Sequence, residues 1–76
     1  MITYQTETIL AELSTTSGGS TKRLTLTSWN NNAAKLDLRV WRTVDGEERP
    51  GRGVTLTTEE AMILLDALEV HFADKG

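Results

Sequence analysis

The sequence predicts an α+β fold in which a four-stranded antiparallel sheet is followed by one C-terminal helix, in the order β-β-β-β-α. Three observations predict this fold. Polar and apolar residues alternate through the first three quarters of the chain, which also hold most of the 12 threonines. Turn sequences separate the alternating stretches, and a helix-capping sequence precedes an apolar stretch of helical period. With 76 residues, we expect a single domain over residues 1–76.

The first expected strand covers residues 4–14, which include threonine, isoleucine and leucine. Its alternation is imperfect, so the sequence leaves open which of its side chains face inward. The segment Ser-Thr-Thr-Ser-Gly-Gly-Ser at 14–20 then predicts a turn, because small polar residues and paired glycines favour turns.

The next two expected strands, residues 22–30 and 35–43, alternate cleanly and are joined by an asparagine-rich turn. Successive side chains of a strand point to opposite faces, so one face of this hairpin is aliphatic and the other is polar. The aliphatic face consists of Leu24, Leu26, Leu36, Leu38 and Val40. The polar face consists of Arg23, Thr25, Thr27, Trp29, Lys35, Asp37, Arg39 and Trp41.

A loop is predicted at residues 44–53, which contain an Asp-Gly and a Pro-Gly pair, and a short fourth strand is expected at 54–56. Thr57 and Glu60 have the spacing of a capping box, in which each side chain bonds the backbone N–H of the other residue. This pattern predicts the start of a helix that covers the aliphatic face of the sheet.

The helix is expected to end at Phe72 or Ala73 and to carry two groups of apolar residues on opposite sides. One is a stripe suited to packing on the sheet, formed by Ala61, Leu64, Leu65, Leu68 and Phe72. The other is a weaker patch formed by Ile63, Ala67 and Val70. Such a patch is either ordinary exposed apolar surface or an interface with a second subunit. A small domain buries little surface on folding, so we expect a homodimer with this patch at its interface.

The composition narrows the function classes. The chain has no cysteine and a single histidine, His71, which excludes disulfides and leaves no zinc or haem ligand set; we expect no metal and no cofactor. A histidine-based triad has no basis, Glu59 and Glu60 belong to the helix cap, and Pro-Gly-Arg-Gly is not a phosphate-binding loop. We therefore expect neither an enzyme nor a small-molecule substrate.

Charge and hydropathy indicate the type of partner. The N-terminal residues lack signal-peptide features, and no apolar run approaches the roughly 20 residues that cross a bilayer. We expect a soluble, cytoplasmic protein without a membrane partner, associated with the nucleoid if bacterial. The net charge is −3, yet residues 22–52 carry seven bases and four acids, a local charge of +3. Such a local field can attract an anion.

Both tryptophans lie on the polar face beside cations rather than among the leucines. One helix cannot cover both faces of the sheet, so this face is expected to be open, with Asp37 orienting Arg39 or a neighbouring cation. Aromatic rings that stack on unpaired bases, with cations that contact phosphates, are typical of single-stranded nucleic-acid binding. The alternative is a protein-interaction module that uses the same tryptophan and arginine side chains.

Three segments resemble a known family. Leu-Asp-Leu-Arg-Val-Trp at 36–41, followed by Arg-Pro-Gly-Arg-Gly-Val-Thr-Leu at 49–56, resembles the transcriptional positive-cofactor-four (PC-four) family. Ser-Trp-Asn at 28–30 is similar to the bacterial YdbC-like branch of that family. The resemblance extends over about 22–68, with the order of the elements intact.

The resemblance implies a curved sheet that binds single-stranded DNA with little sequence preference, in a subunit that dimerises largely through its helix. We expect RNA and melted duplex as further candidate ligands, and a role in transcription, replication or repair. The stacking aromatics would be Trp29 and Trp41. Two departures are Ala61 or Met62, where the family often has a large aromatic, and a loop without the family's lysine. The residues expected to contact nucleic acid are Lys22, Arg23, Thr25, Thr27, Trp29, Asn30, Lys35, Arg39, Trp41, Arg42, Arg49 and Arg52.

Overall fold

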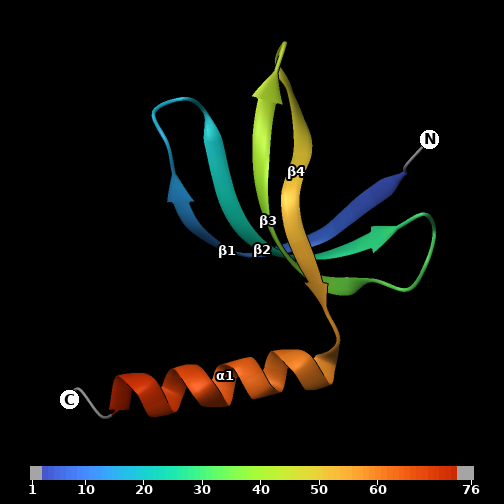
Figure 1. The fold of residues 1–76 in the computed structure, drawn as a ribbon. Helices are drawn as coiled ribbons and strands as arrows, with labels where there is room; N and C mark the ends of the chain where they lie inside the picture. Colours follow the sequence, from blue (N-terminus) through green and yellow to red (C-terminus); the bar gives the residue numbers. More distant parts are fainter. Residues whose placement is uncertain (1–2, 74–76) are drawn as a thin grey trace.

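A computed structural model describes residues 3–73 of the chain. Four strands form one antiparallel sheet in which each strand pairs with its neighbour in sequence, and a single helix follows (Figure 1). These elements are β1 (Tyr4–Thr15), β2 (Ser20–Trp29), β3 (Lys35–Val44), β4 (Glu47–Leu56) and α1 (Thr58–Ala73). The predicted order of elements is confirmed.

The predicted loop at 44–53 is wrong, because most of it belongs to β4. The connection between β3 and β4 is the pair Asp45-Gly46, whose φ angles are 53° and 81°. Positive φ at both central residues is typical of two-residue hairpin turns whose twist matches that of the strands. Pro50 is tolerated within β4 because β4 is an edge strand, where a missing backbone N–H breaks no ladder.

The pairing of β2 with β3 confirms that the two strands present the predicted faces. Leu24 lies opposite Leu38, whereas Thr25 lies opposite Asp37. We call the side with both indoles the tryptophan face; in β2 and β3 it consists of Arg23, Thr25, Thr27, Trp29, Lys35, Asp37, Arg39 and Trp41. We call the opposite side the leucine face; with β4 it consists of Leu24, Leu26, Leu36, Leu38, Val40, Val54 and Leu56.

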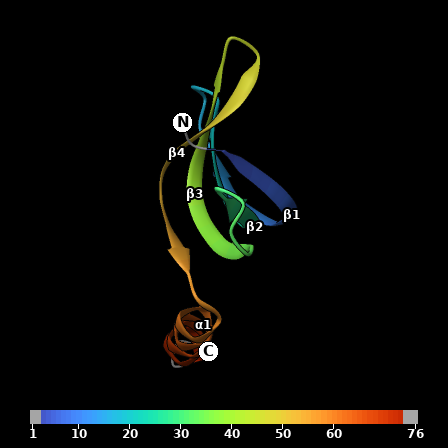
Figure 2. The same ribbon diagram turned by 90° about the vertical axis from the view of Figure 1, so that its right-hand side faces the viewer.

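The tryptophan face, not the leucine face, is the better-buried side of the sheet. The residues at most 4% exposed within 3–73 are Thr25, Thr27, Asp37 and Trp41. The sheet curls around them: β1 has three register shifts against β2, and such bulges increase bending and twist. The edge-on view shows this curvature (Figure 2). The prediction that this face is open is therefore wrong at Trp41.

The helix lies beyond one end of the sheet and leaves most of the leucine face uncovered (Figure 2). Its apolar stripe meets the sheet in a groove lined by Leu24, Leu36, Leu56, Ala61, Leu64, Leu65 and Leu68. No residue of α1 is buried, so the predicted cover is wrong. The radius of gyration is 14.1 Å, whereas a compact chain of this length has about 11 Å. An apolar stripe and much of the leucine face therefore remain accessible.

The predicted start and end of the helix are confirmed. The N–H of Glu60 donates to Thr57 Oγ1 at 3.1 Å, and the N–H of Thr57 donates to Glu60 Oε1 at 2.9 Å. This reciprocal pair satisfies two N–H groups that would otherwise lack partners in the first turn.

Asn30 and Asn31 form the turn after β2 with φ of 52° and 65°, values that asparagine tolerates better than most residues.

The close approach of β3 and β4 can be tested at Gly53, which lies opposite Arg39. A Cβ at this position would collide with the carbonyl oxygen of Leu38 and with Cβ of Arg39. We expect Gly53→Ala to lower the free energy of unfolding by about 1–3 kcal/mol, measured by urea denaturation. The control is Gly18→Ala, whose Cβ would lie 3.8 Å from Thr16 Oγ1. A loss as small as in the control would contradict the close approach.

Candidate nucleic-acid interface

Three aromatic rings gather on the tryptophan face, where Tyr4 lies close to both indoles. The Tyr4 ring lies 5.4 Å from that of Trp29 and 5.5 Å from that of Trp41, tilted by 42° and 56°. Tyr4 opens β1, is paired with Trp29 in the sheet, and donates its hydroxyl hydrogen to the carbonyl oxygen of Glu48 at 3.3 Å. Sequence reasoning missed Tyr4 because the alternation of β1 is irregular; the only tyrosine of the chain, at the start of a strand, was the available signal.

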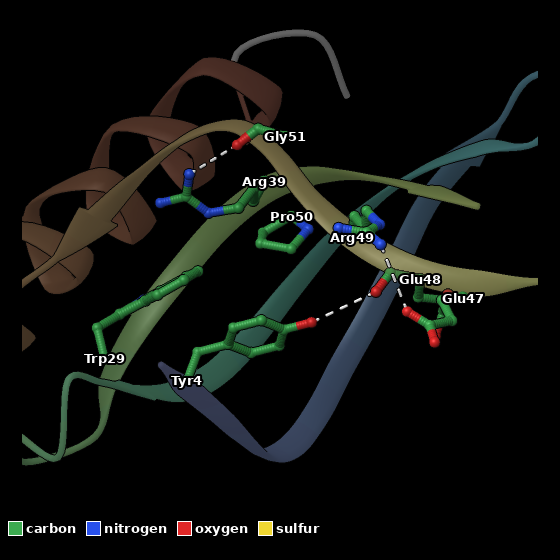
Figure 3. Close-up of a pocket in the computed structure, with 8 residues that line it drawn as sticks. All are labelled: Tyr4, Trp29, Arg39, Glu47, Glu48, Arg49, Pro50 and Gly51. Atoms are coloured by element: carbon green, nitrogen blue, oxygen red, sulfur yellow. Dashed lines mark hydrogen bonds and ion pairs between the residues drawn. The ribbon is translucent and has the colours of Figure 1, made fainter. Parts of the chain in front are cut away.

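A pocket of about 430 Å³ opens over this cluster (Figure 3). Its lining residues are Tyr4, Trp29, Arg39, Glu47, Glu48, Arg49, Pro50 and Gly51. The rings of Tyr4 and Trp29 form one wall, and the β4 backbone around Pro50 lies across from them (Figure 3). The pocket therefore combines aromatic surface with charged groups at its mouth, which suits a flat, polar-edged ring such as a base.

Arg39 is held in place by three different partners. Its guanidinium donates to both carboxylate oxygens of Asp37 at 3.0–3.2 Å and to the carbonyl oxygen of Gly51 at 2.8 Å. It also lies over the Trp29 ring, with 4.7 Å between Cζ and the ring centroid, a cation–π geometry. The prediction that Asp37 orients Arg39 is confirmed. Because Asp37 is fully buried, this bidentate pair neutralises a charge that would otherwise be costly.

Arg23 is held by carboxylates from both edges of the sheet. Its Nε lies 3.1 Å from Glu12 Oε2 on β1, and its Nη2 lies 2.7 Å from Glu48 Oε2 on β4. The hydrogen bond to Glu48, followed by its charge and the contacts with Glu12, raises the pKa of Arg23 above its usual value, although burial opposes this shift. Arg23 therefore stays charged and already has anionic partners.

The arginines of the tryptophan face are thus balanced by acids. Arg23 is paired with Glu12 and Glu48, and Arg39 with Asp37. Lys35 lies beside Trp29 and forms no ion pair within residues 3–73. The face therefore carries three cations and three acids and has a net charge of zero. The excess charge of +3 in residues 22–52 is not located on the tryptophan face.

The remaining predicted cations lie toward the rim. Lys22 and Arg42 alternate with the tryptophan-face residues and so project to the other side of the sheet. Arg49 is exposed at the mouth of the pocket, with Nη2 3.6 Å from Glu47 Oε2. Arg52 is exposed on β4. Of these four cations, only Arg49 lines the aromatic pocket, and Lys22 and Arg42 lie on the opposite side of the sheet.

The predicted neutral donors make contacts within the protein. Thr25 Oγ1 and Thr27 Oγ1 are 2.7 Å apart and buried, and Thr27 Oγ1 also lies 3.3 Å from Thr6 Oγ1. The Asn30 side chain accepts a hydrogen bond from the Thr3 N–H at 3.1 Å. These groups support the face from beneath and at its edge. By contrast, the buried indole N–H groups of both tryptophans have no acceptor within residues 3–73.

The helix patch predicted as a dimer interface is exposed in the single chain. Ile63 and Val70 are 69% and 63% exposed, and Ala67 is exposed as well.

Among residues 3–73 there is no group of three or more histidine, cysteine, aspartate or glutamate side chains placed to hold a metal ion. In the same part of the chain, no helix combines the length and apolar character needed to cross a membrane.

Comparison with known proteins identifies the family of this sheet and helix. Residues 17–67 match the family described as Transcriptional Coactivator p15 (PC4), a span from the β1–β2 turn to the middle of α1 and more than half of the chain. The chain belongs to the PC4 family. The predicted PC-four resemblance is confirmed, and the match is compatible with a YdbC-like branch. PC4 is a non-enzymatic DNA-binding family, which agrees with the expectation that the chain is not an enzyme.

One relative extends the comparison. An "Uncharacterized protein" of Treponema pallidum (strain Nichols) is 39% identical over 56 residues, which cover 74% of this chain. The chain spans 64% of the length of that relative.

Two side chains of the site, Tyr4 and Glu12, lie outside the PC4 match. The matched span therefore includes both tryptophans and the β4 arginines, whereas the third aromatic ring comes from the part of β1 outside it.

The support that Asp37 gives to the site can be tested by Asp37→Asn. This change leaves the buried end of Arg39 without an anion, so we expect a loss of about 3–5 kcal/mol in the free energy of unfolding, measured by urea denaturation. The control is Glu47→Gln, which breaks a pair whose side chains are 62% and 75% exposed and should cost at most about 1 kcal/mol. Equal effects of the two changes would contradict the role assigned to Asp37.

Proposed function

We propose that this PC4-family protein binds single-stranded DNA without catalysis and with little sequence preference, using the pocket over Tyr4 and Trp29. The observation that carries the proposal is this pair of neighbouring aromatic rings in a pocket of about 430 Å³, which two arginines and two glutamates also line. Bases stack on aromatic side chains at about 1–3 kcal/mol each and largely irrespective of sequence. Bases in a duplex already stack on one another, which favours an unpaired strand over a paired one.

The side chains have separate roles in this proposal. Trp29 and Tyr4 offer ring surface to a base, and Arg39 holds one side of the Trp29 ring. Trp41 is 4% exposed, so it supports the Tyr4 ring from beneath rather than stacking directly. The phosphates follow Lys35 beside Trp29, Arg49 at the pocket mouth and the exposed Arg52 on β4. Lys22 and Arg42 project from the other side of the sheet and take no part in this path.

We further propose that the protein acts as a homodimer in the cytoplasm, in transcription, replication or repair. The support for a dimer is the helix, in which no residue is buried and Leu65 is 53% exposed. A second copy that packs its helix against this one would cover the apolar groove and part of the leucine face. That arrangement leaves the tryptophan face, on the other side of the sheet, accessible to a strand.

The stacking role is tested by Trp29→Ala and Tyr4→Ala. Each should weaken binding of a labelled oligo-dT, measured by fluorescence anisotropy, by about 5- to 150-fold, which corresponds to about 1–3 kcal/mol. The matched controls are Trp29→Phe and Tyr4→Phe, which keep an aromatic face and should bind nearly as well as the wild type. For the wild type, the log–log salt dependence should have a slope of about −0.7 per phosphate contacted. Binding that is absent or independent of salt would favour the protein-interaction alternative. The same titration with oligo-U compares the affinity for RNA with that for DNA.

The dimer is tested by light scattering after size exclusion. The wild type should have twice the mass of the 8.4 kDa chain, and Val70→Asp should shift the protein toward a single chain because it places a charge in an apolar interface. Glu69→Gln, one position away on the same helix, should leave the mass unchanged. If the wild-type protein has the mass of a single chain at a protein concentration on the order of tens of micromolar, the proposal is contradicted.

A further inference from the structure

The Arg23 guanidinium occupies the middle of the tryptophan face, where only 14% of its side chain is exposed. Its two ion pairs come from opposite edges of the sheet, with Glu12 on β1 and Glu48 on β4. The shorter contact is to Glu48, at 2.7 Å, which is within the range of strong charge-assisted hydrogen bonds. Arg23 and Glu48 also line a second hollow of the face, together with Trp41 and Tyr4.

A carboxylate and a phosphate compete for the same donors on a guanidinium. Both present oxygens that match its fork of N–H groups, so one anion excludes the other from the same edge. The Glu48 side chain is 52% exposed and can therefore swing away from Arg23. Its backbone is fixed separately, because its carbonyl oxygen accepts the Tyr4 hydrogen bond at 3.3 Å. Changing the side chain therefore leaves the Tyr4 contact available.

We propose that Glu48 is a built-in competitor of the nucleic-acid phosphate at Arg23. Its carboxylate holds the guanidinium in the free protein and must be displaced before a phosphate can bind there. Glu48 thus lowers the affinity for a single strand and keeps the phosphates on the rim cations while bases enter the pocket. This inference rests on the proposed binding of single-stranded DNA.

The inference is tested by Glu48→Gln, with anisotropy titrations of labelled oligo-dT at several salt concentrations. Removing the carboxylate frees Nη2 of Arg23, while Nε remains paired with Glu12. Binding at low salt should therefore tighten by about 2- to 5-fold, the effect of one partly exposed ion pair. The salt slope should steepen by about 0.7, because one more phosphate is contacted. Glu48→Asp keeps the charge but shortens the reach to Arg23, and it should tighten binding to a smaller extent.

Two controls separate this effect from a general change in charge. Glu47→Gln removes the same charge from the next residue, where the pair with Arg49 is longer, at 3.6 Å, and exposed. It should change the affinity by less than about twofold and leave the slope unchanged. In an Arg23→Gln background, Glu48→Gln should no longer tighten binding, since the two changes act through one contact.

The outcomes distinguish the inference from the proposed function. If the wild type binds oligo-dT but Glu48→Gln behaves like Glu47→Gln, the competitor role is overturned and single-strand binding stands. If only Glu48→Gln binds, the competitor role is supported in its strongest form. If neither protein binds while both unfold cooperatively in urea, the proposed function and the inference are both overturned.

Discussion

The ion pair between Asp37 and Arg39 is the interaction on which the rest of the structure depends. Asp37 is fully buried, and a buried carboxylate is stable only with a partner. Arg39 provides that partner from the same strand and extends to the Gly51 carbonyl on β4 and the Trp29 ring on β2. One side chain therefore connects three neighbouring strands and fixes their separation on the curved side of the sheet. The aromatic pocket takes its shape from this connection.

A second property follows from this arrangement: the sheet buries its polar side more completely than its apolar side. Threonine hydroxyls, a carboxylate and an indole fill the inside of the curve, where the hydroxyls of Thr25 and Thr27 bond to each other and the carboxylate bonds to arginine. The leucines lie on the outside of the curve and are only partly covered by one end of the helix. The proposed recognition and the proposed assembly would thus use opposite sides of one sheet within a chain of 76 residues.

The sequence predicted the parts of the fold that depend on short-range patterns. Alternation placed both tryptophans on one face with Arg39, and the spacing of Thr57 and Glu60 located the start of the helix. It did not predict that Trp41 is buried, because burial here results from the curvature of the sheet, and curvature depends on bulges in β1 that alternation cannot reveal. The same bulges concealed Tyr4.

The ion pairs of Arg23 could not be predicted from the sequence pattern either. The sequence shows an excess of cations over residues 22–52, but the partners of Arg23 come from β1 and from the start of β4. Only the antiparallel register brings these carboxylates to the guanidinium. The predicted loop failed for a related reason: Pro50 and the neighbouring glycines suggest a turn, yet an edge strand tolerates them when it pairs on one side only.

The hydrogen bond from Tyr4 to Glu48 also bears on the order in which the molecule forms. Every strand pairing in the sheet joins neighbours in sequence, and such hairpins form on a timescale of about 1–10 μs. The Tyr4–Glu48 contact instead joins residues 44 positions apart, so a much longer loop must close before it can form. A chain emerging from the ribosome can pair β1 with β2 while the aromatic pocket still lacks the β4 wall. The sheet can therefore exist before the site does, and the site is completed only with the final hairpin.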